Sequence, residues 1–176
     1  KGLKSGKESL KRIFEELLQD TYNAEKQIVK ALPELAKAAY HEDLQDAFEN
    51  HLQQTKRQVE RLEKIFDRLK IEKGTETCEA LEGLVKEAKE IIDEHEKSVV
   101  RDVALIIAAQ KVEHYEIAAY GSLVELADVL GLDKTADILE RTLQEEKETD
   151  ELLSNVAQCV NDEAYEESPA ELEYKS

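Results

Sequence analysis

Apolar residues recur along this chain in alternating steps of three and four residues, and no stretch alternates between apolar and polar residues as a strand would. This recurrence is typical of α-helices that bury one face in a core. Only six glycines and two prolines occur among the 176 residues, so few positions are available to break long helices. The pattern therefore predicts an all-α protein.

The helical pattern divides into four long helices and one shorter helix. Pro33 lies inside the first long helix, which either kinks or breaks there. Asp133 is the expected N-cap of the last long helix. Residues 1–160 then form one domain, and residues 161–176 form an acidic tail that is loose or only partly helical. The expected helices span residues 8–39, 42–70, 77–95, 98–130 and 134–161.

The buried face of each long helix is apolar at both ends and polar in the middle. Consecutive long helices that are joined by short turns run antiparallel, so we expect the polar middles to meet at one level of a bundle. Tyr22, Tyr115 and Tyr120 flank this level, either as hydrogen-bond partners of its carboxylates or through packing alone. The polar positions are Glu25, His51, Thr55, Gln58, Glu113, Glu116, Thr142, Glu146 and Thr149.

Two helical hairpins of similar pattern follow each other along the chain. Glu25 corresponds to Glu116, and Leu62 to Leu153, at one constant offset. A repeat of hairpins builds a pseudo-symmetric four-helix bundle with a longer crossover between the halves. The shorter helix at 77–95 lies in that crossover, and its apolar stripe requires burial against its own bundle or against a partner. The stripe consists of Leu81, Leu84, Val85, Ala88 and Ile92.

Four glutamates at one level of a core are costly, because a buried carboxylate must be paired, protonated or bound to a metal ion. No Lys or Arg occupies the buried-face positions of this level. Three explanations of the four glutamates remain, namely a bound cation, a shared proton or a wrong assignment of the buried face. Oxygen-rich sites with one imidazole suit iron or manganese, and four glutamates can hold two carboxylate-bridged ions. The candidate metal ligands are Glu25, Glu113, Glu116 and Glu146, with His51 as a further candidate and Glu145 or Asp150 as substitutes for Glu146.

The net charge of −17 restricts the classes of partner. Nucleic acids and anionic membrane surfaces require clustered Lys and Arg, whereas an acidic surface fits a basic protein partner. The longest apolar run, residues 103–109, is too short to span a membrane. Cys78 and Cys159 form neither a C-x-x-C motif nor a disulfide framework, which favours a reducing, cytoplasmic location.

Five stretches resemble the YciE/YciF family of ferritin-like proteins, namely residues 18–27, 51–52, 59–62, 109–121 and 143–153. The resemblance spans roughly residues 10–160, and 109–121 is its most specific part. It implies a ferritin-like antiparallel four-helix bundle with an additional short helix between the hairpins. It also implies a homodimer, kinship with rubrerythrin-type di-iron proteins and an association with bacterial stress responses.

The resemblance also implies a ligand set, because di-iron bundles carry one Glu on each of two helices and Glu-x-x-His on each of the others. Glu25 matches the Glu of the first helix, Glu113 and Glu116 match the Glu-x-x-Glu of rubrerythrin-like proteins, and Glu146 matches the last helix. Neither Glu-x-x-His motif is intact. Thr55, Gln58 and Thr149 stand at motif positions, and His51, Gln54 or Asp150 could compensate from neighbouring turns.

These observations leave three functional hypotheses. The first is an iron or manganese protein, either a ferroxidase-like or a peroxidase-like oxidoreductase that acts on oxygen or peroxide. The second is a non-catalytic, dimeric stress or interaction protein with a vestigial metal site. The third, iron storage in a cage of many subunits, has the least support, since no sequence feature identifies the contacts that a cage needs.

Overall fold

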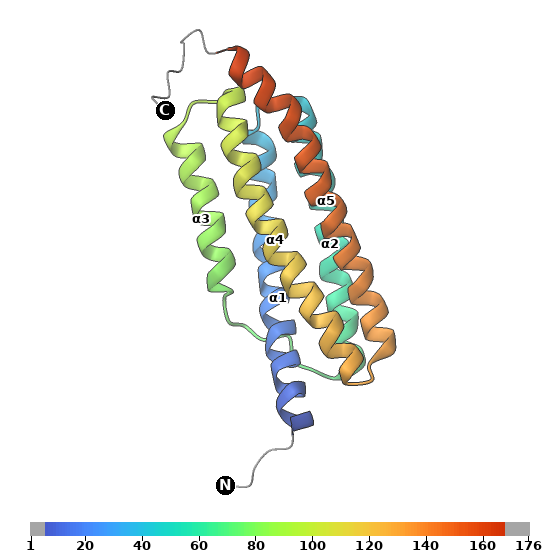
Figure 1. Ribbon diagram of the computed structural model, residues 1–176. Helices are drawn as coiled ribbons and strands as arrows, with labels where there is room; N and C mark the ends of the chain where they lie inside the picture. The colour runs from blue at the N-terminus through green and yellow to red at the C-terminus, as the bar shows by residue number, and fades with distance from the viewer. Residues whose placement is uncertain (1–5, 168–176) are drawn as a thin grey trace, which may run out of the picture.

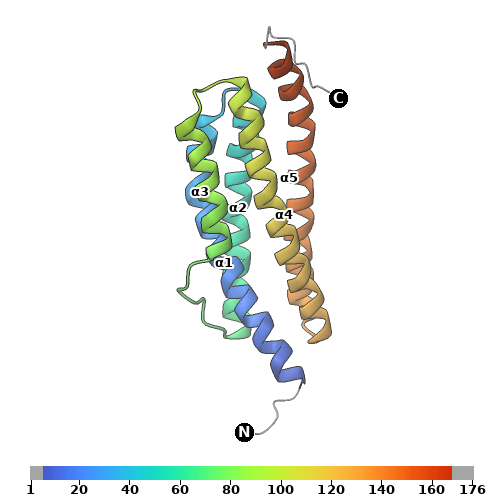
Figure 2. The same ribbon diagram turned by 60° about the vertical axis from the view of Figure 1, so that its left-hand side comes forward.

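The computed structural model describes residues 6–167, which form five α-helices without any strand. Helices α1, α2, α4 and α5 form an antiparallel bundle, and α3 lies beside α1 and α4 (Figure 1 and Figure 2). The predicted all-α, ferritin-like four-helix bundle with an additional short helix in the crossover is confirmed. The helices are α1 (Gly6–Ala38), α2 (Glu42–Leu69), α3 (Glu79–Glu94), α4 (Val99–Val129) and α5 (Asp133–Glu166).

The start and the end of α5 differ from the predicted ones, and α1 does not break at Pro33. Helix α1 continues through Pro33 to Ala38, so it is one helix rather than two pieces. The N-cap of α5 is Leu132, and Asp133 is instead the first helical residue, where its charge favours the positive end of the helix dipole. Helix α5 runs to Glu166, beyond the expected end at 161, while residues 168–176 of the predicted tail lie outside the described residues.

The apolar stripe of α3 is buried against its own bundle. Leu81 and Ala88 are buried, and Leu84, Val85 and Ile92 are partly buried against the core cluster that α1, α2, α4 and α5 share. This packing decides between the two alternatives for the stripe. Helix α3 thus packs along α1 and α4 on one side of the bundle.

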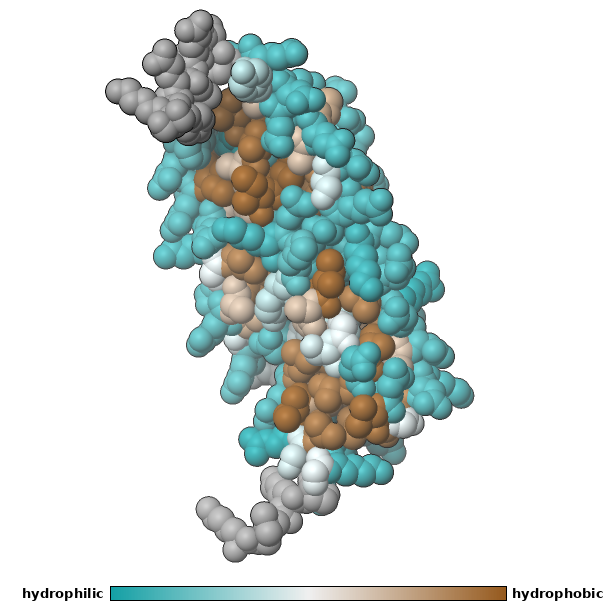
Figure 3. Space-filling view, in the orientation of Figure 1, coloured by the Kyte–Doolittle hydropathy of each residue, from teal (hydrophilic) through white to brown (hydrophobic). Residues whose placement is uncertain are grey.

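The surface is mostly hydrophilic, with apolar patches on the face shown in Figure 3. One patch lies over the N-terminal half of α4, where the side chains of Val100 and Ile107 are more than half exposed. Within residues 6–167, no helix combines the length and the apolar character that a membrane-spanning helix requires.

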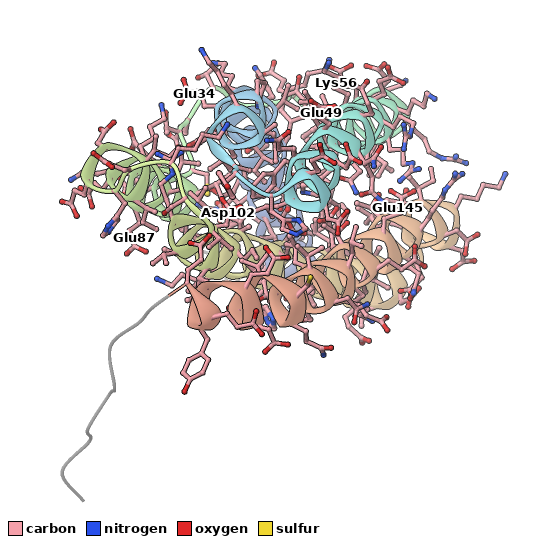
Figure 4. All side chains as sticks on the ribbon, turned by 90° about the horizontal axis from the view of Figure 1, so that it is seen from above. Glu34, Glu49, Lys56, Glu87, Asp102 and Glu145 are labelled. Carbon is pink, nitrogen blue, oxygen red and sulfur yellow. The ribbon has the colours of Figure 1, made fainter. Side chains whose placement is uncertain are left out.

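Two buried charged residues at the start of α4 hold the connections at one end of the bundle. The Asp102 carboxylate accepts hydrogen bonds from the backbone N–H groups of Tyr40 (2.9 Å) and His41 (2.7 Å). Arg101 donates to the carbonyl oxygens of Ala38 and His95, the latter at 2.9 Å. In the view along the bundle, Asp102 lies among the helices, whereas labelled residues such as Glu34 and Glu87 lie at the rim (Figure 4).

We therefore predict that Asp102→Ala lowers the free energy of unfolding by about 2–4 kcal/mol, because the backbone N–H groups of Tyr40 and His41 lose their buried acceptor. The measurement is urea denaturation followed by circular dichroism. Asp128→Ala, an exposed change on the same helix, serves as the control and should alter the stability by no more than about 0.5 kcal/mol. Equal effects of the two substitutions would contradict this role of Asp102.

Candidate metal centre

A layer of buried polar side chains divides the core into two apolar clusters. Ile28, Phe48 and Leu153 belong to the cluster on one side, and Leu62 and Leu139 belong to the cluster on the other. The predicted buried faces are therefore correct, because each of the nine expected polar positions is buried at this level. They are Glu25, His51, Thr55, Gln58, Glu113, Glu116, Thr142, Glu146 and Thr149.

Four of these side chains converge on one point. One ligand atom from each of His51, Glu113, Glu116 and Glu146 lies within 4.8 Å of the corresponding atoms of the others. His51 Nε2 is 3.1 Å from Oε1 of Glu113. Glu113 and Glu116 share one face of α4 because they are one helical turn apart, and antiparallel packing brings His51 of α2 and Glu146 of α5 to the same level.

Glu25 lies beside this group and is held by an aromatic neighbour. The Tyr120 hydroxyl donates a hydrogen bond of 2.5 Å to Oε1 of Glu25, which leaves Oε2 without a partner. Of the three flanking tyrosines, only Tyr120 binds a carboxylate of the layer. Tyr22 donates to Glu63, and Tyr115 donates to Asp20.

The amide candidates already have partners within the chain. Gln58 Nε2 donates to Oε1 of Glu146 and, over 3.2 Å, to Glu145. Gln54 Oε1 accepts a hydrogen bond from Thr149 and lies 3.3 Å from Nδ1 of His51. Gln58 thus positions a carboxylate of the group, and Gln54 orients the His51 ring so that Nε2 faces Glu113.

Asp150, the remaining candidate, is not brought to the group. Its carboxylate is 3.2 Å from Gln110 Nε2 and 3.2 Å from Nε2 of the exposed His114. Glu145 is not a substitute for Glu146 either, because Arg61 binds both of its carboxylate oxygens, at 2.6 and 2.8 Å. This ion pair was not expected from the sequence. The only signal was the position of Arg61 directly before the buried residue Leu62.

The carboxylates of the layer are short of hydrogen-bond donors. His51 Nε2, although close to Glu113, also lacks a hydrogen bond of suitable geometry. A buried polar atom without a partner costs about 1–3 kcal/mol, and more when the group is charged. The unpartnered oxygens are Glu25 Oε2, Gln58 Oε1, Glu113 Oε2, both oxygens of Glu116, and Glu146 Oε2.

The ionisation of the metal-free layer follows from burial and crowding. Burial raises the pKa of Glu25 to about 7, and raises the pKa values of Glu116 and Glu146 well above the ordinary value. Neighbouring carboxylates raise the pKa values of Glu116 and Glu146 further. Burial lowers the pKa of His51, but the charges of Glu113 and Glu146 more than offset it and bring this pKa to about 10.

An apolar cavity leads to the group. It has a volume of about 40 Å³, room for a few water-sized molecules, and ends at His51, Glu113 and Thr149. Glu34 and Lys89, which also line it, form an exposed ion pair whose charged atoms are 3.5 Å apart. The walls come from α1 to α5 and include Leu32, Phe48, Leu84, Ala88, Ala109 and Leu153.

The residues of the layer fit a bound cation. Several acceptor oxygens lack donors, and three carboxylates and one imidazole converge within the span that the ligands of a single ion occupy. A divalent cation would satisfy these oxygens and remove their mutual repulsion. Glu25 Oε2 is the additional acceptor that a second ion would require.

Comparisons with known proteins agree with this architecture. The family described as a domain of unknown function, DUF892, matches residues 9–165. The chain is 49% identical over 152 residues to Protein YciF of Escherichia coli K12, which covers 85% of this chain and 90% of that protein. These similarities confirm the resemblance to the YciE/YciF family.

Two solved structures support the same relationship. The crystal structure of the E. coli stress protein YciF superposes with a TM-score of 0.84 at 47% identity, covering 87% of this chain and 97% of that chain. The structure of YcfI from Rhodopseudomonas palustris gives a TM-score of 0.79 at 39% identity, covering 82% and 92%.

We predict that the metal-free protein loses stability as the pH rises from about 5 to about 9. The folded pKa of Glu25, about 7, exceeds its ordinary value of 4.5, and Glu116 shifts in the same direction, so the folded state binds the extra protons in this range. The stability that His51 contributes is complete below its ordinary pKa of 6.5 and is lost as the pH approaches about 10. The carboxyl groups and His51 therefore both lower the free energy of unfolding as the pH rises.

Urea denaturation in the presence of a chelator, repeated over this pH range, measures the effect. Glu116→Gln should flatten the decline, whereas Glu125→Gln, an exposed change on the same helix, should leave it unchanged. A stability that increases with pH, or equal slopes in the two variants, would show that the buried layer does not titrate in this way.

Proposed function

The chain belongs to the DUF892 family, and we propose that it is a ferritin-like metal protein that holds divalent iron or manganese in the middle of its bundle. The observation that carries this proposal is the convergence of His51, Glu113, Glu116 and Glu146, with carboxylate oxygens that lack hydrogen-bond donors. The relative from E. coli is described as a stress protein, and we extend a role in bacterial stress to this chain. The free cysteines, Cys78 and Cys159, support the proposal of a cytoplasmic location.

The donor set favours a particular class of ion. Three carboxylates and one imidazole, without a thiolate, suit iron or manganese better than the softer ions that prefer sulfur. His51, Glu113, Glu116 and Glu146 would hold the first ion. Glu25 would add a carboxylate for a second ion, oriented by its hydrogen bond from Tyr120.

Bound iron or manganese would supply redox chemistry that the side chains of this chain lack. The chain itself excludes bulk water, since both apolar clusters close over the layer. The cavity that ends at His51 and Glu113 is lined mainly by apolar side chains, so it favours small, neutral molecules. Oxygen and peroxide are both neutral and small enough, which supports an oxidoreductase acting on one of them.

A specific observation favours the alternative of a non-catalytic protein with a vestigial site. The hydroxyl group of Thr55 donates to the carbonyl oxygen of His51, and that of Thr149 donates to Gln54 and to the carbonyl oxygen of Glu145. Both threonines stand where a complete di-iron motif carries a ligand. Metal content therefore separates the two proposals.

We predict that the protein, purified without chelators, contains close to one iron or manganese ion per chain, or two if Glu25 is also a ligand. Glu113→Gln should abolish binding because it removes a ligand charge from the group, whereas the exposed Glu125→Gln should bind normally. Elemental analysis measures the metal content. Binding should also release protons from the layer, which calorimetry in buffers of different ionisation enthalpy detects. Absence of metal after anaerobic reconstitution with ferrous iron would refute the proposal and favour the vestigial alternative.

We also propose a homodimer formed through the apolar patch of α4. Val100 and Ile107 lie on one face of α4, two turns apart, and expose more than half of their surface.

We predict that Ile107→Asp converts the dimer into a monomer, as measured by sedimentation velocity, because it places a charge in the apolar contact. Lys111→Asp, one turn further along the same face, should weaken the dimer much less. A dimer that Ile107→Asp leaves intact would place the contact elsewhere.

A further inference from the structure

A second group of metal-ligating side chains lies at the end of the bundle, away from the buried layer. His41, in the turn between α1 and α2, meets Cys159 and Glu163 of α5, and the ligand atoms of all three lie within 4.8 Å of one another. The C-terminal part of α5 passes beside the start of α2 at this end (Figure 1). Glu163 lies in the part of α5 that extends beyond the expected end at 161, so this group follows from the longer helix.

The distances within the group match those around a tetrahedral ion. His41 Nε2 is 3.4 Å from Oε1 of Glu163, and Cys159 Sγ is 3.7 Å from the same oxygen. A zinc ion with bonds of about 2.0–2.3 Å separates its ligand atoms by about 3.3–3.8 Å. Cys159 and Glu163 are one helical turn apart on α5, so the helix itself fixes two of the three ligands.

A neighbouring carboxylate can orient the imidazole. Nδ1 of His41 accepts a hydrogen bond of 3.2 Å from the backbone N–H of Asp43, and Oδ2 of Asp43 lies 3.9 Å from the same nitrogen. When a metal ion occupies Nε2, the ring proton moves to Nδ1. Nδ1 then no longer accepts from the backbone N–H of Asp43, and its N–H can donate a hydrogen bond to the Asp43 carboxylate. Ligating histidines usually donate their other N–H group to a carboxylate or carbonyl in this manner.

We propose that His41, Cys159 and Glu163 form a second metal site, for a borderline-soft divalent cation of the Zn²⁺ class, with an open fourth position for water. The thiolate distinguishes this site chemically from the buried layer, which offers only oxygen and nitrogen ligands. His41 is partly buried and Glu163 is about half exposed, so a cation can reach the site from solvent. Bound metal would fasten the C-terminal end of α5 to the turn between α1 and α2.

Cobalt tests this proposal without reference to the buried centre. Co²⁺ added to the reduced, metal-free protein should give a thiolate-to-cobalt charge-transfer band in the near ultraviolet, at one ion per chain and independently of protein concentration. Cys159→Ser should abolish this band. Cys78→Ser should retain it, because the sulfur atom of Cys78 lies against Tyr115 and Asp20, in a different part of the molecule. Cobalt bound in the buried layer cannot produce the band, since no thiolate is present there.

The other residues of the site have matched controls. His41→Gln and Glu163→Gln should each weaken Co²⁺ binding at least tenfold, and Asp43→Asn should weaken it by about 10-fold to 100-fold. Glu166→Gln is an exposed change on α5, the helix that carries Glu163. It removes the same charge as Glu163→Gln and should have no effect on Co²⁺ binding. Absence of the band in protein with titratable thiols, or a band that survives Cys159→Ser, would overturn the proposal.

Discussion

The cost of removing carboxylates from water is the constraint on which the rest of this structure depends. Glu113, Glu116 and Glu146 converge with His51 in a region that excludes solvent, and burial disfavours the charged forms of Glu116 and Glu146 by raising their pKa values. The two apolar clusters stabilise the bundle enough to keep them there. Arrangements that cost stability without evident structural benefit are common at functional sites, which is why the layer carries the functional proposal.

The surroundings of the layer restrict its geometry while leaving acceptors free. Tyr120 and Gln58 each bind one oxygen of a carboxylate and leave the other oxygen unpartnered. Arg61 is bound to Glu145 and to the hydroxyl of Thr142 at the edge of the layer, so His51, with its raised pKa, is the cationic group that faces the carboxylates. The side chains are held in place, but the hydrogen-bond network of the layer is incomplete without a further ligand. This combination favours a cation-binding site.

Helical spacing predicted the fold and the membership of the polar layer, because positions such as Glu25 and Glu146 lie on the same faces as unambiguous apolar residues. Helical spacing did not exclude Asp150 as a ligand, because a small rotation of α5 about its axis would turn this side chain towards the layer. The contact with Gln110, which is distant in sequence, fixes the direction of Asp150 instead. The end of α5 was predicted too early, because burial of Val160 and packing of Ala164 extend the helix through an acidic segment. The group around His41 was invisible for the same reason, as it needs Glu163 on that extension.

We infer that the buried layer weakens the metal-free fold and becomes stabilising when a cation binds. Thermal unfolding of the wild-type protein and Glu116→Gln, with a chelator and with saturating Mn²⁺, tests it directly. Without metal, and at a pH where Glu116 is ionised, we expect Glu116→Gln to be more stable by roughly 1–3 kcal/mol, because an unpartnered buried carboxylate becomes an amide that can donate to its neighbours. With Mn²⁺ at about 100 times Kd, the wild type should gain about 2.7 kcal/mol and the variant much less. A variant that is less stable without metal, together with equal gains from Mn²⁺, would contradict this role of the buried layer.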